Sequence, residues 1–306
     1  MPIPRSRKGI GPDGARAAQE RELRVALLSL ANLTVPDADP LRQIEAAATA
    51  GFDAVGLCLN PSDRPGASLV RDAAERRRAR QRLTELDMRV LDIEIFPLEP
   101  GTEVKALTPA LAAGAELGAE FVLVTGNDED EARVCDNYAA LCDLAAPFRL
   151  RPMLEFITWR PLRDIHQAAR WLRRAARPAG GMCVDALHLF RSGGTVADLR
   201  RIDAAHIGYV QLADAATLEP AERFSEAELM HEARSDRRLP GRGVLPLAAF
   251  MRALRPGLAV SVEAPCAAHA HLSVEERALL AMEATRPVLS EYLARPLSES
   301  DLAKRG

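Results

Sequence analysis

Four apolar runs in the second half of the chain each contain, at or near their end, a side chain with oxygen donors. These side chains are Glu155, Asp185, Gln211 and Glu263. Carboxylates in apolar runs are rarely buried without a partner, and three of them at one site would repel one another. The same runs contain no Lys or Arg, so a divalent cation is the partner that fits. All-oxygen ligation suits Mn²⁺ or Mg²⁺ better than Zn²⁺, and Co²⁺ would also fit.

Taken one at a time, each of these acids could equally be a helix cap or a salt-bridge partner. Their equivalent positions on four consecutive runs favour one shared site. His188 follows Asp185 at a spacing of three residues. A histidine there titrates close to neutral pH and could act as a general base, and the alternative is a hydrogen-bonded structural histidine.

Arg191 begins a glycine-rich segment, residues 191–195, that runs into an expected helix. An arginine and free backbone N–H groups at a helix N-terminus favour an anionic or hydroxyl-rich substrate group. The segment could instead be a simple capped loop. Other plausible pocket residues are Asn32, Glu94, Asn127, Trp159 and Arg237.

Short apolar runs alternate with stretches of helical spacing, and the first seven runs recur at intervals of roughly thirty residues, as βα units do. The expected strands are Val25–Leu30, Ala54–Leu59, Arg89–Phe96, Glu120–Val124, Met153–Phe156, Met182–Val184, Ile207–Leu212 and Leu258–Val262. The expected helices include Leu41–Ala50, Leu69–Leu86, Leu107–Leu117, Asp130–Ala146, Leu162–Ala176 and Val196–Ile202. This alternation predicts a single-domain (β/α)₈ TIM barrel, in which the four oxygen-bearing side chains converge on one mouth.

Local signals mark several boundaries. Thr195 with Asp198 resembles a capping box, and Gly51, Gly118 and Gly180 are expected to end helices. The interval 213–257 is longer than the others and is a candidate lid. No G-x-G-x-x-G follows the first strand and no P-loop motif occurs, so no nucleotide cofactor is expected.

The composition is typical of a globular protein. Of its 306 residues 48% are hydrophobic and only 4% aromatic, which favours helices packed on aliphatic strands. The net charge of −3 gives no reason to expect a nucleic-acid partner. No apolar run reaches membrane-spanning length, so we expect no membrane partner. The five cysteines are scattered and odd in number, which indicates free thiols, and we therefore expect a cytoplasmic protein.

These features divide the chain into three parts. We expect residues 1–23 to form a flexible arm without the apolar core of a secretory signal, 24–292 to form the barrel, and 293–306 to form a tail. A homodimer is a further expectation for a barrel of this kind.

With these residues in place, the chain resembles the xylose-isomerase-like TIM-barrel superfamily, often called the sugar phosphate isomerase/epimerase family, over roughly 23–292. Members end strands five to eight with Glu, Asp, His or Gln, and Glu, which bind one Mn²⁺, Mg²⁺ or Co²⁺. The resemblance therefore implies that Glu155, Asp185, Gln211 and Glu263 are metal ligands. It also implies a small polyhydroxylated carbonyl compound as substrate, bound by residues such as Arg191, Arg237, Glu94 and Trp159.

Gln211 and the Asp185–His188 spacing are more similar to 3-dehydroshikimate dehydratases and hydroxypyruvate isomerases than to ketose 3-epimerases, which typically have histidine at the Gln211 position. The segments 191–194, 210–214 and 237–243 add to the likeness with the dehydratases, although those enzymes usually have an acid where this chain has Arg242.

The likeness implies proton abstraction next to a carbonyl. In a dehydratase His188 would be the base, whereas in an isomerase or epimerase Glu155 and Glu263 would act as the acid/base pair. A metal-binding barrel without turnover, acting as a partner subunit, is the alternative of another class.

Overall fold

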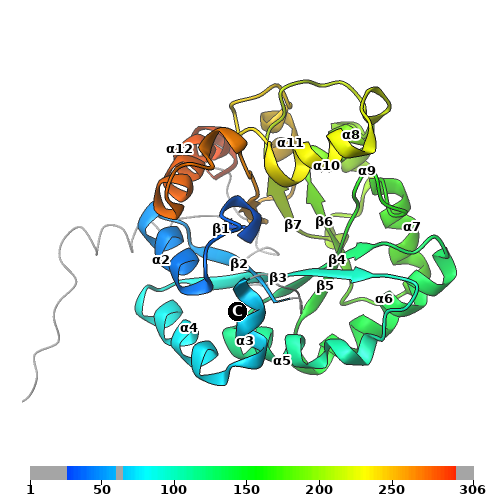
Figure 1. Ribbon diagram of the computed structural model, residues 1–306. Coiled ribbons are helices and arrows are strands. Elements are labelled where there is room, and N and C mark those ends of the chain that lie inside the picture. Colours follow the sequence, from blue (N-terminus) through cyan, green and yellow to red (C-terminus); the bar gives the residue numbers. More distant parts are fainter. Residues whose placement is uncertain (1–25, 60–64, 294–306) are drawn as a thin grey trace, which may run out of the picture.

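The computed structural model describes residues 26–59 and 65–293. The expected N-terminal arm, and the expected tail apart from Leu293, lie outside these ranges. Eight parallel strands close into a barrel in sequence order, and β8 pairs with β1 to complete it (Figure 1). The strands are β1 (Leu28–Leu30), β2 (Ala54–Cys58), β3 (Arg89–Leu98), β4 (Phe121–Gly126), β5 (Arg151–Glu155), β6 (Gly181–Asp185), β7 (Ile207–Leu212) and β8 (Ala259–Val262). The predicted single-domain TIM barrel is confirmed.

Helices form a ring around the barrel (Figure 1). They are α2 (Pro40–Ala50), α3 (Ser68–Arg71), α4 (Ala73–Glu85), α5 (Thr108–Leu117), α6 (Glu131–Ala145), α7 (Ile165–Ala175), α8 (Ala186–Arg191), α9 (Val196–Arg201), α10 (Glu226–Ser235), α11 (Leu247–Ala253) and α12 (Val274–Leu293). None of the helices in the described ranges is long and apolar enough to cross a membrane.

The expected helix 69–86 is broken in two at Asp72. This residue has extended backbone angles, and its carboxylate accepts the backbone N–H groups of Ala74 and Glu75, so it begins α4 as an N-cap. A good capping residue inside a helical pattern therefore starts a new helix there.

Most of the expected helix boundaries are confirmed. The Thr195–Asp198 capping box is present, and Gly51 (φ 88°) and Gly118 (φ 80°) end α2 and α5 in the left-handed conformation that glycine adopts readily. The expectation for Gly180 is wrong, because α7 already ends at Ala175 and Ala176 takes the left-handed turn.

The interior of the barrel forms its own small core, separate from the layer between strands and helices. This core contains Ala54, Leu91, Phe121, Leu123, Met153, Cys183 and Tyr209. The rings of Phe121 and Tyr209 stack with centroids 5.1 Å apart. A Cβ on Gly208 would lie only 2.3 Å from Met153 Sδ, so the strand needs glycine there to admit Met153. This packed floor closes the barrel below the strand ends.

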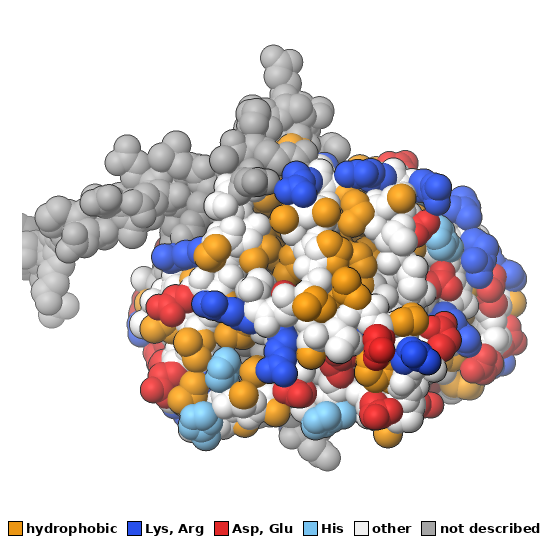
Figure 2. Space-filling model, turned by 90° about the horizontal axis from the view of Figure 1, so that it is seen from above, with side chains coloured by type: hydrophobic (Ala, Val, Ile, Leu, Met, Phe, Trp, Pro, Cys, Tyr) orange, Lys and Arg blue, Asp and Glu red, His pale blue; other side chains and the backbone are white. Residues whose placement is uncertain are grey.

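The interval 213–257 is more structured than the expected loop, since it contains α10 and α11. Its exposed hydrophobic side chains include Leu218 and Val244. Figure 2 shows the molecule from above, where apolar side chains gather near the centre of the face and charged side chains of both signs surround them.

Candidate active site

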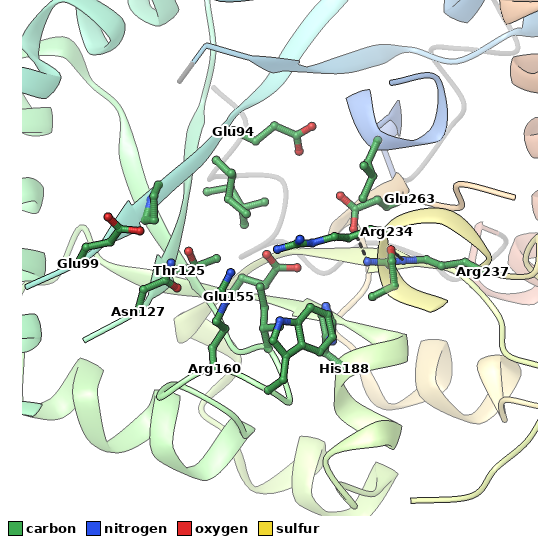
Figure 3. A pocket seen from close by; sticks show the side chains of 17 residues that line it. Glu94, Glu99, Thr125, Asn127, Glu155, Arg160, His188, Arg234, Arg237 and Glu263 are labelled. Atoms are coloured by element: carbon green, nitrogen blue, oxygen red, sulfur yellow. Dashed lines mark hydrogen bonds and ion pairs between the residues drawn. The ribbon is translucent and has the colours of Figure 1, made fainter. Parts of the chain in front are cut away.

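A pocket of about 360 Å³ opens at the carboxyl ends of the strands (Figure 3). Acidic residues on or just after β3, β5 and β8 line it, together with arginines from the β5–α7 loop, from α10 and from the segment just after α10. Its charged lining residues are Glu94, Glu99, Glu155, Arg160, Arg234, Arg237 and Glu263, with His188 beside them. The predicted mouth of the barrel therefore holds a charged pocket.

Glu155, Asp185 and His188 form the tightest cluster at this pocket. Each offers a ligand atom, these atoms all lie within 4.8 Å of one another, and all three residues are buried. Asp185 is the N-cap of α8 and accepts the backbone N–H of His188 at 3.0 Å. The spacing of three residues between Asp185 and His188 is thus the spacing of an N-cap, which places the histidine beside the carboxylate.

Arg237 lies between two of the predicted ligands. Its Nη1 donates to Asp185 Oδ2 at 2.6 Å, and its Nη2 lies 2.8 Å from Glu263 Oε2. Its Nε donates to the carbonyl of Ala233 at 2.7 Å, which ties it to α10. Arg237 lines the pocket, as expected for a substrate-binding residue. Its guanidinium, however, pairs with the carboxylates of Asp185 and Glu263.

Burial and like charge set the electrostatics of the cluster. Burial, together with the neighbouring charges of Glu263 and Asp185, raises the pKa of Glu155 well above its ordinary value. Burial also opposes ionisation of Asp185, but the charge of Arg237 outweighs it and lowers the pKa of Asp185. One guanidinium therefore stabilises Asp185 and leaves Glu155 with an excess of negative charge around it.

His188 is held as a neutral ring. Burial lowers its pKa to about 4, with Arg237 adding to the effect and Asp185 opposing it. Its Nδ1 is buried and has no hydrogen-bond partner among the residues that the structure describes. The ring of Trp159 meets it edge-on, with centroids 5.4 Å apart. His188 therefore lies in the pocket in a form that can accept a proton.

Gln211 is fully buried near the end of β7. Its side-chain oxygen, the atom expected to bind metal, lies next to Cys183. The Cys183 thiol donates to Gln211 Oε1 at 3.4 Å, while the amide nitrogen has no partner within residues 26–59 and 65–293. Of the four predicted ligands, the structure thus brings Glu155 and Asp185 together and places Glu263 across Arg237. Gln211 lies on the neighbouring strand, in register with Asp185.

Arg191 was expected to bind substrate, but its side chain binds other residues of the protein. Its guanidinium binds Glu232 at 2.6 and 2.8 Å and donates to the carbonyls of Thr217 and Glu219. It also lies over the ring of Phe224. These partners occupy it fully, so it anchors the segment after β7 to α8.

Of the remaining pocket candidates, some line the pocket and others do not. Glu94, Trp159 and Asn127 line the pocket, as expected. Asn32 is buried and donates to Gln43 Oε1, so it supports α2.

The pocket is also lined by four residues that were not among the candidates expected from the sequence, namely Arg160, Arg234, Thr125 and Glu99. Arg160 carried a usable signal, because it lies five residues beyond Glu155, in the loop that leaves β5 at the mouth of the barrel. Arg234 lies in the last turn of α10 and Arg237 just beyond that helix, and only the packing of α10 brings both side chains to the pocket.

Asp214 organises the loop that follows Arg237. It pairs with Arg238 through two backbone hydrogen bonds of 2.8 and 2.9 Å. Its carboxylate accepts the backbone N–H groups of Gly241, Gly243 and Leu245 at 2.9 to 3.1 Å. A Cβ on Gly243 would lie 2.4 Å from Asp214 Oδ1, so glycine is needed for this approach. Asp214 thus fixes the chain on one side of Arg237.

Residues 44–286 match the model of the xylose isomerase-like TIM-barrel family, and the chain belongs to that family. A 3-dehydroshikimate dehydratase of Pseudomonas putida is 28% identical over 254 residues, which are 79% of this chain and 36% of that relative. The chain therefore spans little more than a third of the length of that enzyme.

Solved structures share the fold. The IolI protein, determined with a bound zinc atom, matches with a TM-score of 0.73 at 18% identity, over 88% of this chain and 100% of that chain. The D-psicose 3-epimerase of Clostridium cellulolyticum, determined with D-tagatose, matches with a TM-score of 0.67 at 13% identity, over 86% and 99%. At these identities the two structures show a shared fold.

Proposed function

We propose that this chain is a divalent-metal-dependent enzyme that removes a proton next to a carbonyl group, and that it is a lyase of the 3-dehydroshikimate dehydratase type. The observation that carries the proposal is the cluster of Glu155, Asp185 and His188, whose ligand atoms lie within 4.8 Å of one another in the pocket. The likeness to the Pseudomonas putida dehydratase supports the choice of reaction.

The donor set fits a divalent ion. Glu155, Asp185 and Glu263 are buried side by side, and the guanidinium of Arg237 pairs with Asp185 and Glu263. The negative charges around Glu155 oppose its ionisation, and a dication would stabilise the ionised carboxylates. Rotating the Gln211 amide by half a turn exchanges its oxygen and nitrogen, and the atom without a partner would then be an oxygen. Glu155, Asp185, Gln211 and Glu263 would hold the ion, which we expect to be Mn²⁺ or Mg²⁺, with Co²⁺ also accepted.

When bound, such an ion polarises carbonyl and hydroxyl oxygens. The chain's own residues do the rest. The neutral His188 accepts the proton next to the carbonyl, and Trp159 packs against its ring and limits its orientation. The proton that His188 has accepted can then pass to the departing hydroxyl group, which leaves as water, while Glu155 stays ionised as one of the residues that would hold the ion. The packed barrel floor keeps water away from the site from below.

The test is to incubate Mn²⁺- or Mg²⁺-loaded protein with 3-dehydroshikimate and to follow the ultraviolet absorbance of an aromatic product. We expect metal-dependent formation of protocatechuate that a chelator abolishes. A flat trace from protein with confirmed bound metal would reject this reaction. Uptake of solvent deuterium by a ketose, an inosose or hydroxypyruvate would then identify the chain as an isomerase or epimerase.

A further inference from the structure

Three consecutive polar side chains in the loop between β5 and α7 have no hydrogen-bond partner within the described parts of the chain. Thr158 Oγ1 and Trp159 Nε1 are buried polar atoms in this condition. The guanidinium of Arg160 forms no ion pair or hydrogen bond with any described residue, and only its backbone N–H is bonded, to the carbonyl of Ile157. Buried polar groups are normally paired, so a run of this kind indicates a loop that binds a ligand.

This loop belongs to the pocket. Trp159 and Arg160 both line it, together with Glu155. Figure 3 shows the side chain of Arg160 extending from the loop toward the interior of the pocket, on the side of Glu155. The indole of Trp159 also contacts the ring of His188, which connects the loop to the residue that we propose as base.

Other arginines near the pocket are neutralised by acids. Arg237 lies 2.6 Å from Asp185 and 2.8 Å from Glu263, and Arg191 lies 2.6 Å from Glu232. Arg160 is half-buried in the same part of the molecule and has no such partner among residues 26–59 and 65–293. A guanidinium in this setting binds a carboxylate through two parallel hydrogen bonds, and partial burial strengthens the pairing.

We infer that Arg160 is the binding residue for a carboxylate group of the substrate, with the indole N–H of Trp159 as a second donor. The substrate class is then a polyhydroxylated oxo acid, held by its acid group at the β5–α7 loop and by its oxygen-bearing carbons beside Glu155 and His188. This inference rests on the proposed function, because it assigns the residue that binds the carboxylate of the substrate at the same site.

The test compares two ligands that differ only in this charge, shikimate and its methyl ester. Their affinities for Mn²⁺-loaded wild-type protein, Arg160→Gln and Arg163→Gln are measured by calorimetry. Arg163 is the matched control, because it is an exposed arginine of the same loop. We expect the wild-type protein and Arg163→Gln to prefer the acid by about 10- to 100-fold, the usual effect of a charged hydrogen-bonded pair. Arg160→Gln should lose this preference, and Arg160→Lys should retain part of it.

Equal binding of acid and ester by the wild-type protein would overturn the inference, as would no binding of either. A preference that survives in Arg160→Gln would also overturn it, and so would competition by inorganic phosphate that is stronger than that by shikimate. If the acid is preferred through Arg160 but 3-dehydroshikimate is not converted, the proposed reaction fails and the carboxylate site stands. The two claims are thereby separated.

Discussion

Arg237 Nη1 lies 2.6 Å from Asp185 Oδ2, and both side chains are almost completely buried, at 2% and 0% exposure. The same guanidinium reaches Glu263, so one cation connects strands β6 and β8 at the mouth of the barrel. The charges of these carboxylates outweigh burial and raise the pKa of Arg237. Arg237 is therefore the permanent counter-charge of the acidic site.

Arg237→Gln should strongly destabilise the metal-free protein. Removing one partner of a buried ion pair leaves uncompensated charge and costs about 3–5 kcal/mol. We expect this loss in the free energy of urea unfolding at neutral pH, and we expect saturating Mn²⁺ to restore part of it. Arg238→Gln is the control, because Arg238 is the exposed neighbour on the same loop. An equal effect of both variants would show that the ion pairs are not the cause.

His188→Ala should lower kcat for the proposed reaction by roughly 10²–10⁴-fold, the usual contribution of a general base. His231→Ala, which removes an exposed histidine of α10, should have no effect. Because the pKa of His188 is about 4, the wild-type rate should not fall on its account until the pH drops below roughly 5.

Metal content separates two roles of His188. We expect His188→Ala to keep its bound metal, measured by elemental analysis. Loss of metal together with activity would make His188 a ligand, and retained activity would contradict its role as base.

Asp92 should make stability depend on pH. It is buried on β3, where Tyr209 donates to its Oδ2 at 3.1 Å, and burial raises its pKa from 3.8 to about 7. The folded state therefore binds a proton that the unfolded state releases above about pH 4. The stability that this proton provides is complete below pH 3.8 and is lost as the pH rises through about 7, by up to about 1.4 kcal/mol per pH unit.

The measurement is the free energy of unfolding of chelator-treated wild-type protein and Asp92→Asn between pH 4.5 and about 8. The neutral amide carries no such cost, so the variant should gain stability relative to the wild-type protein as the pH rises. A difference that does not change with pH would contradict the raised pKa of Asp92.

The strands, most of the helices and the place of the charged pocket at the mouth of the barrel could be predicted from the sequence. Parallel barrel strands are buried on both faces and read as apolar runs, so a carboxylate at the end of such a run, as at Glu155 and Asp185, is conspicuous. The pairing of Arg237 with Asp185 could not be predicted, because it depends on how α10 packs in an interval that shows no strand pattern. The partner of Arg191 could not be predicted for the same reason, because Glu232 is distant in sequence and lies on α10.

Asp214→Asn should reduce activity by displacing Arg237, although Asp214 itself does not line the substrate pocket. An amide has only one acceptor oxygen for the backbone N–H groups that the carboxylate binds, so we expect a loss of roughly 2–4 kcal/mol in unfolding free energy. Mn²⁺ affinity should also fall, because Arg237 is displaced. Glu222→Gln, an exposed change in the same interval, is the control. Normal Mn²⁺ affinity in a destabilised Asp214→Asn protein would limit Asp214 to a structural role.

The proposed function requires that the carboxylates at the strand ends hold one divalent ion. The most direct test is a calorimetric titration of Mn²⁺ into chelator-treated wild-type protein and Glu155→Gln. We expect one ion per wild-type chain and an affinity at least about tenfold weaker in Glu155→Gln, because a charged ligand is lost. No binding by the wild-type protein, or equal binding by both proteins, would contradict the account.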